Sequence, residues 1–473
     1  MREVLEASFF YRVLAAVYAW FGRQWRQSRL ISAFLRPGCG AAMGESSMFA
    51  RLWQALHRAV CAVFSALRLD RALEGSVFRR VWFWCMLPVA AAPILPTMAV
   101  AALAAAGLFS VFVCWGSDRT MRRPAAPVNK YILLFAALYL IATFTSVTVR
   151  GSLQGGILTV FFILFGLALQ SAVTTRRQLD RTAFVLVLVG TVTAAYGVAQ
   201  YLLGLAGAAN WLDSAKFTDI DMRVYSTLDN PNVLAEYLVL IFPLAFAFLL
   251  TKKGARSRVL ALIACGVMAL CLVLTYSRGG WLGFLVAMAL FLVILDRRFI
   301  VLGLAALVAL YFILPDAVVS RFTSIGDMSD SSTTYRVAIW MGTIAMLRDY
   351  WICGIGPGTA AFNMVYPSYS YSAATAQHSH NLYLQIVSDC GVGGIAVFLM
   401  LLVSFVRMLG GAAARERDRT SRVFQTALLS GMLGFLVQSA TDYSFYNYRM
   451  ILLFWVYISL GVLFARRSEM EEG

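Results

Sequence analysis

Long apolar stretches separated by short polar gaps repeat along the chain from Val81 onward. Most approach the roughly 20 residues that a helix needs to cross a bilayer, and a helix satisfies its own backbone hydrogen bonds in lipid. The pattern therefore predicts an all-α polytopic membrane protein with about twelve transmembrane helices. We expect spans at 81–95, 97–116, 131–149, 153–172, 182–204, 232–251, 258–275, 280–296, 299–314, 382–406, 423–440 and 447–465. The first two are short, and with Pro93 and Pro96 between them they could instead form one tight hairpin or a single long tilted pair.

The polar gaps alternate in charge along this series. Most arginines and lysines fall in every second gap, for example at Arg122, Arg177, Lys252, Arg297 and Arg466. By the positive-inside rule, this side is cytoplasmic and both termini lie there. The opposite gaps, 150–152, 205–231, 276–279, 315–381 and 441–446, would then face outward from the cytoplasmic (inner) membrane.

The outward gap at 315–381 is too long for a simple connection. Ser331, Ser332 or Thr333 can cap a helix that runs to about Leu347, and a glycine-rich turn follows it. We interpret this loop as an amphipathic helix on the outer membrane surface with a segment that folds back over the bundle.

Residues 1–80 precede the first span and are rich in arginine, with two stretches of helical period at 7–35 and 47–78. Neither stretch is apolar enough to cross the bilayer. We favour an interfacial arm on the cytoplasmic leaflet over a small soluble domain or a partner-binding arm. The predicted organisation is thus an arm (1–80), a transmembrane domain (81–465) and a cytoplasmic tail (466–473).

Composition supports this interpretation. Hydrophobic residues make up 60% of the chain and charged residues 14%, and the mean hydropathy is +0.73. The net charge of +16 could indicate nucleic acid, but the basic residues stand where topology determinants stand, so we expect no such partner. The eight cysteines include no C-x-x-C pair, and the sequence indicates no disulfide framework, metal site or cofactor.

Arg278 and Arg336 are among the arginines that stand on the outward side, against the charge bias. Arg278 lies in a turn so short that its guanidinium must be at the edge of the hydrocarbon, and no carboxylate lies within ten residues of it. Arg336 lies in the first turn of the loop helix, where the macrodipole favours an anion. Both suit a bound phosphate. The alternatives are that Arg278 extends to the interface and that Arg336 pairs with Asp327 or Asp330.

Two of the three histidines, His378 and His380, precede the helix that begins "NLYLQIV". A lone histidine at a membrane edge is commonly structural. Beside two outward arginines, however, the imidazole of His380 could accept a proton from a hydroxyl while the guanidinium groups stabilise a leaving diphosphate. These are the groups needed to transfer a sugar from a polyprenyl diphosphate to a hydroxyl.

These residues stand within motifs that resemble the O-antigen ligase and polymerase family. The motifs are "STLDNPNVLAEYLVLIFPLA" (226–245), "TYSRGGWLG" (275–283), "YRVAIWMGTIAML" (335–347), "GIGPGTAAF" (354–362) and "QHSHNLYLQIVSDCGVGG" (377–394). The resemblance implies a metal-independent glycosyltransferase of the C superfamily that takes a glycan from undecaprenyl diphosphate on the outer face of the membrane. It implies His380 as the base and Arg278 and Arg336 as the diphosphate clamp. The arm is not part of the family pattern, and Asp389 stands where glutamate is common.

Further candidates lie near these motifs. Substrate-binding candidates are Asn381, Arg223, Asn230, Asn232, Glu236 and Tyr335. For Asn230 and Glu236 the alternative is a helix cap followed by a paired acid. Asp389 lies about 180° around a continuous helix from His380, so we expect it to hydrogen-bond a neighbouring helix. Asp442, Tyr446 and Arg449 face outward in the last loop, where an aromatic belt would explain the tyrosines.

Other functions fit parts of the pattern. Twelve spans also suit a bicarbonate-type transporter, but the chain has no internal repeat and no paired broken helices. A metal-dependent enzyme of the same superfamily would require carboxylates in the first outward turn, 92–97, which has none. Ligase and polymerase share the residues above, so the acceptor, whether lipid, polymer or protein, stays open.

Overall fold

The computed structural model describes residues 48–117, 126–205, 222–296, 315–324 and 330–470, together with Gly303 and Phe312. The chain divides into two compact units, Met1–Ala59 and Val60–Gly473. Around this boundary the chain forms α5 (Met48–Ala66), α6 (Leu69–Ala72) and the 3-10 turn η1 (Val77–Arg79). The predicted helix at 7–35 and most of the predicted span at 299–314 lie outside the described residues.

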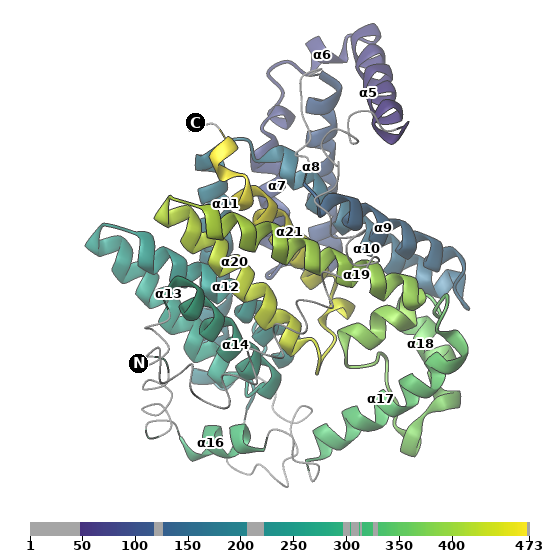
Figure 1. The fold of residues 1–473 in the computed structure, drawn as a ribbon, viewed down its shortest axis with the longest axis vertical. Coiled ribbons are helices and arrows are strands. Elements are labelled where there is room, and N and C mark those ends of the chain that lie inside the picture. Colours follow the sequence, from purple (N-terminus) through teal and green to yellow (C-terminus); the bar gives the residue numbers. More distant parts are fainter. Residues whose placement is uncertain are drawn as a thin grey trace, which may run out of the picture. The chain divides into compact units, whose positions relative to one another are not determined.

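A bundle of long helices makes up most of the second unit (Figure 1). Its members are α7 (Val81–Ala91), α8 (Thr97–Ser117), α9 (Asn129–Phe144), α10 (Val149–Ala172), α11 (Arg176–Leu202), α12 (Pro231–Thr251), α13 (Ala255–Leu274), α14 (Arg278–Leu295), α19 (Leu382–Arg415), α20 (Arg419–Gln438) and α21 (Tyr448–Ala465). Among the described residues, eight helices are long and apolar enough to cross a membrane. The prediction of an all-α polytopic membrane protein is confirmed.

The predicted spans map onto these helices with local differences. The stretches at 81–95 and 97–116 form two separate helices, α7 and α8, which pack against each other. The stretch at 131–149 ends early, at Phe144, and α9 therefore has 16 residues. Helix α20 is continuous over 20 residues but is more polar than the eight.

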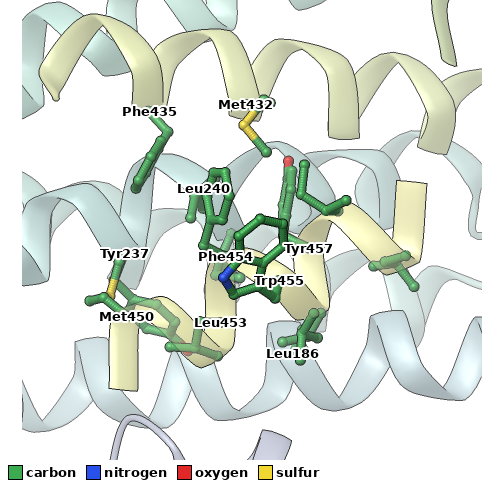
Figure 2. Close-up of a cluster of buried hydrophobic side chains, with 14 of the residues drawn as sticks. Leu186, Tyr237, Leu240, Met432, Phe435, Met450, Leu453, Phe454, Trp455 and Tyr457 are labelled. Atoms are coloured by element: carbon green, nitrogen blue, oxygen red, sulfur yellow. The ribbon is translucent and has the colours of Figure 1, made fainter. Parts of the chain in front are cut away.

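The core of the bundle lies around α12 and α21, which are buried along almost their whole lengths. Figure 2 shows Trp455, Phe454 and Tyr457 of α21 packed among Met432 and Phe435 of α20. In contrast, peripheral helices expose apolar side chains, as α13 does with Leu260 (59%), Leu262 (58%) and Ile263 (53%). Exposure of this extent is unfavourable in water, but it costs nothing against lipid.

The connection between α14 and α19 has structure of its own. It contains α16 (Asp316–Thr323), α17 (Ser331–Tyr350), α18 (Thr359–Val365) and the 3-10 turns η2 (Tyr366–Tyr369) and η3 (Tyr371–Ala373). Helix α17 buries Ile339 and Met346 in a small core with α18 and η2, and it leaves Met341 and Ile344 about half exposed. Its apolar residues therefore lie on more than one face. The cap is Asp330, which accepts from the backbone of Thr333, rather than Ser331, Ser332 or Thr333.

The loop docks onto α19 at a break in that helix. Gly391 interrupts α19 with φ 67° and ψ −168°, a conformation that only glycine adopts without strain. The freed backbone groups bond to the loop: Val392 N–H donates to the carbonyl of Trp351 (2.7 Å), and Ile355 N–H donates to the carbonyl of Ser388 (2.7 Å). The loop is thus fixed against the bundle through backbone hydrogen bonds.

Candidate functional site

A polar cavity lies where the loop meets the ends of α12, α14 and α20. It holds about 300 Å³, part of it open to solvent. Its lining includes Arg223, Asn232, Tyr276, Ser277, Arg278, Gly279, Arg321, Ser332, Arg336, Gln438, Thr441 and Asp442. We call it the arginine pocket, because four arginines converge on it from segments far apart in the chain.

Arg278 begins α14, where Ser277 caps the helix by accepting from Gly280 N–H (3.3 Å). The sequence offered it no carboxylate nearby, but the loop supplies one. Its guanidinium donates to Asp330 Oδ1 (2.8 Å) and to the carbonyl of Ser324 (3.0 Å). Arg278 therefore does not simply extend to the interface: it anchors the loop across the mouth of the bundle.

Asp330 is fully buried and joins two arginines, Arg278 and Arg321, the second at 3.3 Å. Burial alone would raise the pKa of the Asp330 carboxyl, but the hydrogen bond and charge of Arg278 outweigh it and hold the pKa below its ordinary value. The alternative that Arg336 pairs with Asp330 is wrong, and Asp327 lies outside the described residues.

Arg223 and Asn232 also line the arginine pocket. The guanidinium of Arg223 is 5% exposed and donates to the carbonyl of Thr275 (2.7 Å) and to Asn232 Oδ1 (2.9 Å). Burial, and then the neighbouring charges of Arg321 and Arg336, lower the pKa of Arg223 to about 9. The side chain of Arg223 is still cationic at neutral pH.

Asp442 connects the arginine pocket to His380. Its Oδ2 lies 3.6 Å from Arg336 and its Oδ1 lies 3.5 Å from Nδ1 of His380. Burial alone would raise the pKa of Asp442, but His380 and Arg336 outweigh burial and hold it well below its ordinary value. The carboxylate is therefore ionised and faces one ring nitrogen of a histidine whose side chain is 25% exposed.

Local bonds fix the position of His380. Asn381 caps α19 by accepting from Leu384 N–H (3.0 Å), and its amide donates to the carbonyl of Ala440 (2.7 Å) at the end of α20. This bond brings the start of α19 beside Asp442. His380 itself has φ 49°, a left-handed conformation that costs energy for a residue with a side chain, and Trp340 Nε1 donates to its carbonyl (3.3 Å).

His378 lies behind His380, with ring centroids 4.2 Å apart, and stacks on Tyr446 at 4.9 Å. Burial, followed by the charge of His380, lowers the pKa of His378 to about 3. An imidazole with so low a pKa is a weak proton acceptor. Of the two histidines, the structure makes His380 the accessible one.

The other predicted residues divide into two groups. Tyr335 stands beside the site: its ring is 6.0 Å from that of His380, and its hydroxyl donates to the carbonyl of Thr375. Asn230 and Glu236 stand outside the lining of the arginine pocket. Asn230 caps α12, and Glu236 is fully buried and accepts from Ser439. The structure thus contains the helix cap at Asn230, which the sequence left open as the alternative to a substrate-binding role.

Three residues gained importance only in the structure. Arg321 was not singled out, although it too is an arginine on the outward side of the charge pattern. Asp442 was noticed only for its place in the last loop, and Asp330 only as a partner for Arg336. Nothing local marks these carboxylates, because their partners are distant in sequence.

His378 also lines a second cavity, of about 400 Å³, together with Tyr139, Gln385 and Asp389. Asp389 accepts from the hydroxyl of Tyr139 (2.9 Å) on α9 and from the amide of Gln385 (2.9 Å). The prediction that Asp389 bonds a neighbouring helix and does not orient the imidazole is confirmed.

Comparison with known proteins agrees with the motifs. A search of curated proteins finds no match. Residues 263–399, however, match the family described as O-antigen ligase. This region runs from α13 through the loop to α19, and it carries Arg278, Arg336 and His380. The match supports a ligase- or polymerase-type function in polysaccharide biosynthesis at a membrane, and we conclude that residues 263–399 are similar to the O-antigen ligase family.

Proposed function

We propose that the protein is an O-antigen ligase-like glycosyltransferase that moves a glycan from undecaprenyl diphosphate to an acceptor hydroxyl. The observation that carries the proposal is the convergence of four arginines and the Asp442–His380 pair at one end of the bundle. Each of the four arginines carries a guanidinium group that can donate two parallel hydrogen bonds, and such a set suits a diphosphate.

In the proposed reaction, His380 accepts the proton of the acceptor hydroxyl. The hydroxyl oxygen forms a bond to the anomeric carbon, the bond from that carbon to the diphosphate oxygen breaks, and the diphosphate leaves with the electron pair. Asp442 stabilises the resulting imidazolium, while Arg336 and its neighbours stabilise the charge that develops on the leaving group. The guanidinium groups take the part that a divalent metal plays elsewhere.

The reconstituted, purified protein tests this proposal. It should release undecaprenyl diphosphate and lengthen or glycosylate an acceptor, and a chelator should leave the rate unchanged. No transfer with any lipid-linked glycan, or a clear requirement for Mg²⁺ or Mn²⁺, contradicts it. Deletion in the source cell separates the two enzyme classes: a ligase leaves long polymer on the carrier, and a polymerase leaves single repeat units.

We also propose that the loop faces outward from the cytoplasmic membrane, with the termini and the basic arm (1–80) on the cytoplasmic side. The charge pattern supports this orientation. In a background with the exposed Cys353 changed to serine, Thr375→Cys should react with an impermeant thiol reagent added outside, and Ala414→Cys should not. Inverted labelling contradicts the orientation.

A further inference from the structure

A wide groove lies at the end of the bundle opposite the loop. It holds about 1210 Å³, including open solvent, and is formed by the start of α11, the end of α12 and the start of α20. Among the described residues that line the groove, the positive side chains are Arg176, Arg177, Arg181 and Lys252, and the only carboxylate is that of Asp180. The proposed transfer reaction uses none of these residues.

The carboxylate of Asp180 is paired with an arginine outside the groove lining. Both oxygens of Asp180 accept from the guanidinium of Arg467, the second at 2.9 Å. Arg176 donates to the backbone carbonyls of Arg467 and Ser468, so the charges that we consider further are those of Arg177, Arg181 and Lys252. The groove therefore presents a strongly positive surface that favours an anion.

The floor of the groove is aromatic rather than polar. Phe184, Phe248 and Phe424 pack edge to face, with ring centroids 6.2 and 4.9 Å apart, and the ammonium of Lys252 lies 5.2 Å from the Phe248 ring centre. A free inorganic anion gains nothing from such a floor. A ligand with both charge and hydrocarbon gains from both parts.

An exposed apolar stripe leads from the groove along α11. Phe184 (51% exposed), Leu188 (48%), Val192 (53%) and Tyr196 (46%) follow at four-residue spacing and therefore share one face of the helix. Arg177 and Arg181 continue this face to the charged end. The groove is thus basic at the membrane surface and apolar toward the interior, which is the polarity of a phospholipid.

We propose that this groove binds the headgroup of an anionic phospholipid, with the phosphate near Arg177, Arg181 and Lys252 and an acyl chain along the stripe of α11. Basic pockets between helix ends at the membrane surface are suited to such headgroups. The bound lipid would hold α11, α12 and α20 together at the end of the bundle away from the arginine pocket.

Thermal unfolding of the purified full chain in detergent, with added lipid, tests the proposal. Phosphatidylglycerol should raise the unfolding temperature, and phosphatidylcholine and inorganic phosphate should raise it little. The variant Arg177→Gln/Arg181→Gln should bind phosphatidylglycerol about 30-fold more weakly, from about 1 kcal/mol per basic residue. The control Arg407→Gln/Arg415→Gln removes two exposed arginines of α19 outside the groove and should bind like the unaltered protein.

Each other result overturns the proposal. If phosphatidylcholine stabilises the protein as much as phosphatidylglycerol does, the lipid charge plays no role. If inorganic phosphate alone stabilises it as much, the groove binds anions and not lipids. Equal weakening in both double variants indicates a general surface charge effect. The comparison of lipids on the unaltered protein needs no variant, so poor folding of the double variant does not weaken the test.

Discussion

Nδ1 of His380 lies 3.5 Å from Oδ1 of Asp442, across the junction of α19 with the loop between α20 and α21. The distance is long for a hydrogen bond, but it suits an ion pair once the imidazole is protonated. Asp442 also faces Arg336. One carboxylate thus couples the proposed base to the proposed diphosphate pocket, and the predictions below test its parts.

We expect His380→Gln to reduce transfer by about 10²–10⁴-fold, because the amide cannot accept the hydroxyl proton. His378→Phe is the control. It keeps a ring that can stack on Tyr446 and loses only the hydrogen bond that Nδ1 of His378 accepts from His380 N–H (3.3 Å), so most activity should be retained. Rates are measured with saturating lipid-linked glycan. Similar losses of activity in the two variants would contradict the proposal that His380 is the base.

Asp442→Asn should lower kcat by up to about 10⁴-fold with a smaller change in KM, because the amide neither orients the imidazole nor stabilises the imidazolium. Asp442→Glu should recover part of the rate. A variant that changes only KM would instead make Asp442 a structural partner of Arg336.

Arg336→Lys should slow transfer roughly 10²-fold, since an ammonium cannot donate through a planar fork to a diphosphate. Arg348→Lys makes the same exchange on the exposed part of α17 and should leave the rate unchanged. The steady-state rate of diphosphate release is the measurement. An unaffected Arg336→Lys enzyme contradicts the clamp.

Asp330→Asn should destabilise the protein by about 3–5 kcal/mol, because Arg278 and Arg321 would be left buried without their shared carboxylate. The folded-state pKa of Asp330 is lowered, so its contribution is present above the ordinary carboxyl pKa of about 3.9 and is lost as pH falls through the folded value. The difference in unfolding temperature should hold from about pH 8 to 5 and narrow below about 4. A constant difference down to acid pH would contradict this account.

Gly391→Ala should destabilise the docked loop by about 3 kcal/mol or more, because φ is 67° and an added Cβ would overlap the carbonyl of Ile352. Gly393→Ala is the matched control. Nothing lies within 4 Å of its Cβ position, and alanine should leave stability unchanged or raise it by about 1 kcal/mol. Protease protection of the loop is the measurement, and equal protection in both variants would contradict the docking role.

The sequence alone determined the helices and most of their ends. The signals for these helices are local, since a cap and its helix are neighbours in the chain. They are the length of each apolar stretch and the capping residues Asn230, Ser277 and Asn381. The motifs around Arg278 and His380 also indicated the family that residues 263–399 match.

Only the tertiary structure decided how the charges pair. Arg278 meets Asp330, and His380 and Arg336 meet Asp442, through segments that no periodicity connects. Such pairs form because burial makes an isolated charge costly, so packing selects the partners that the folded chain brings within reach. The break in α19 at Gly391 was also decided by the tertiary structure. A glycine within an apolar stretch does not indicate that the helix opens there or that a distant loop bonds to the opened backbone.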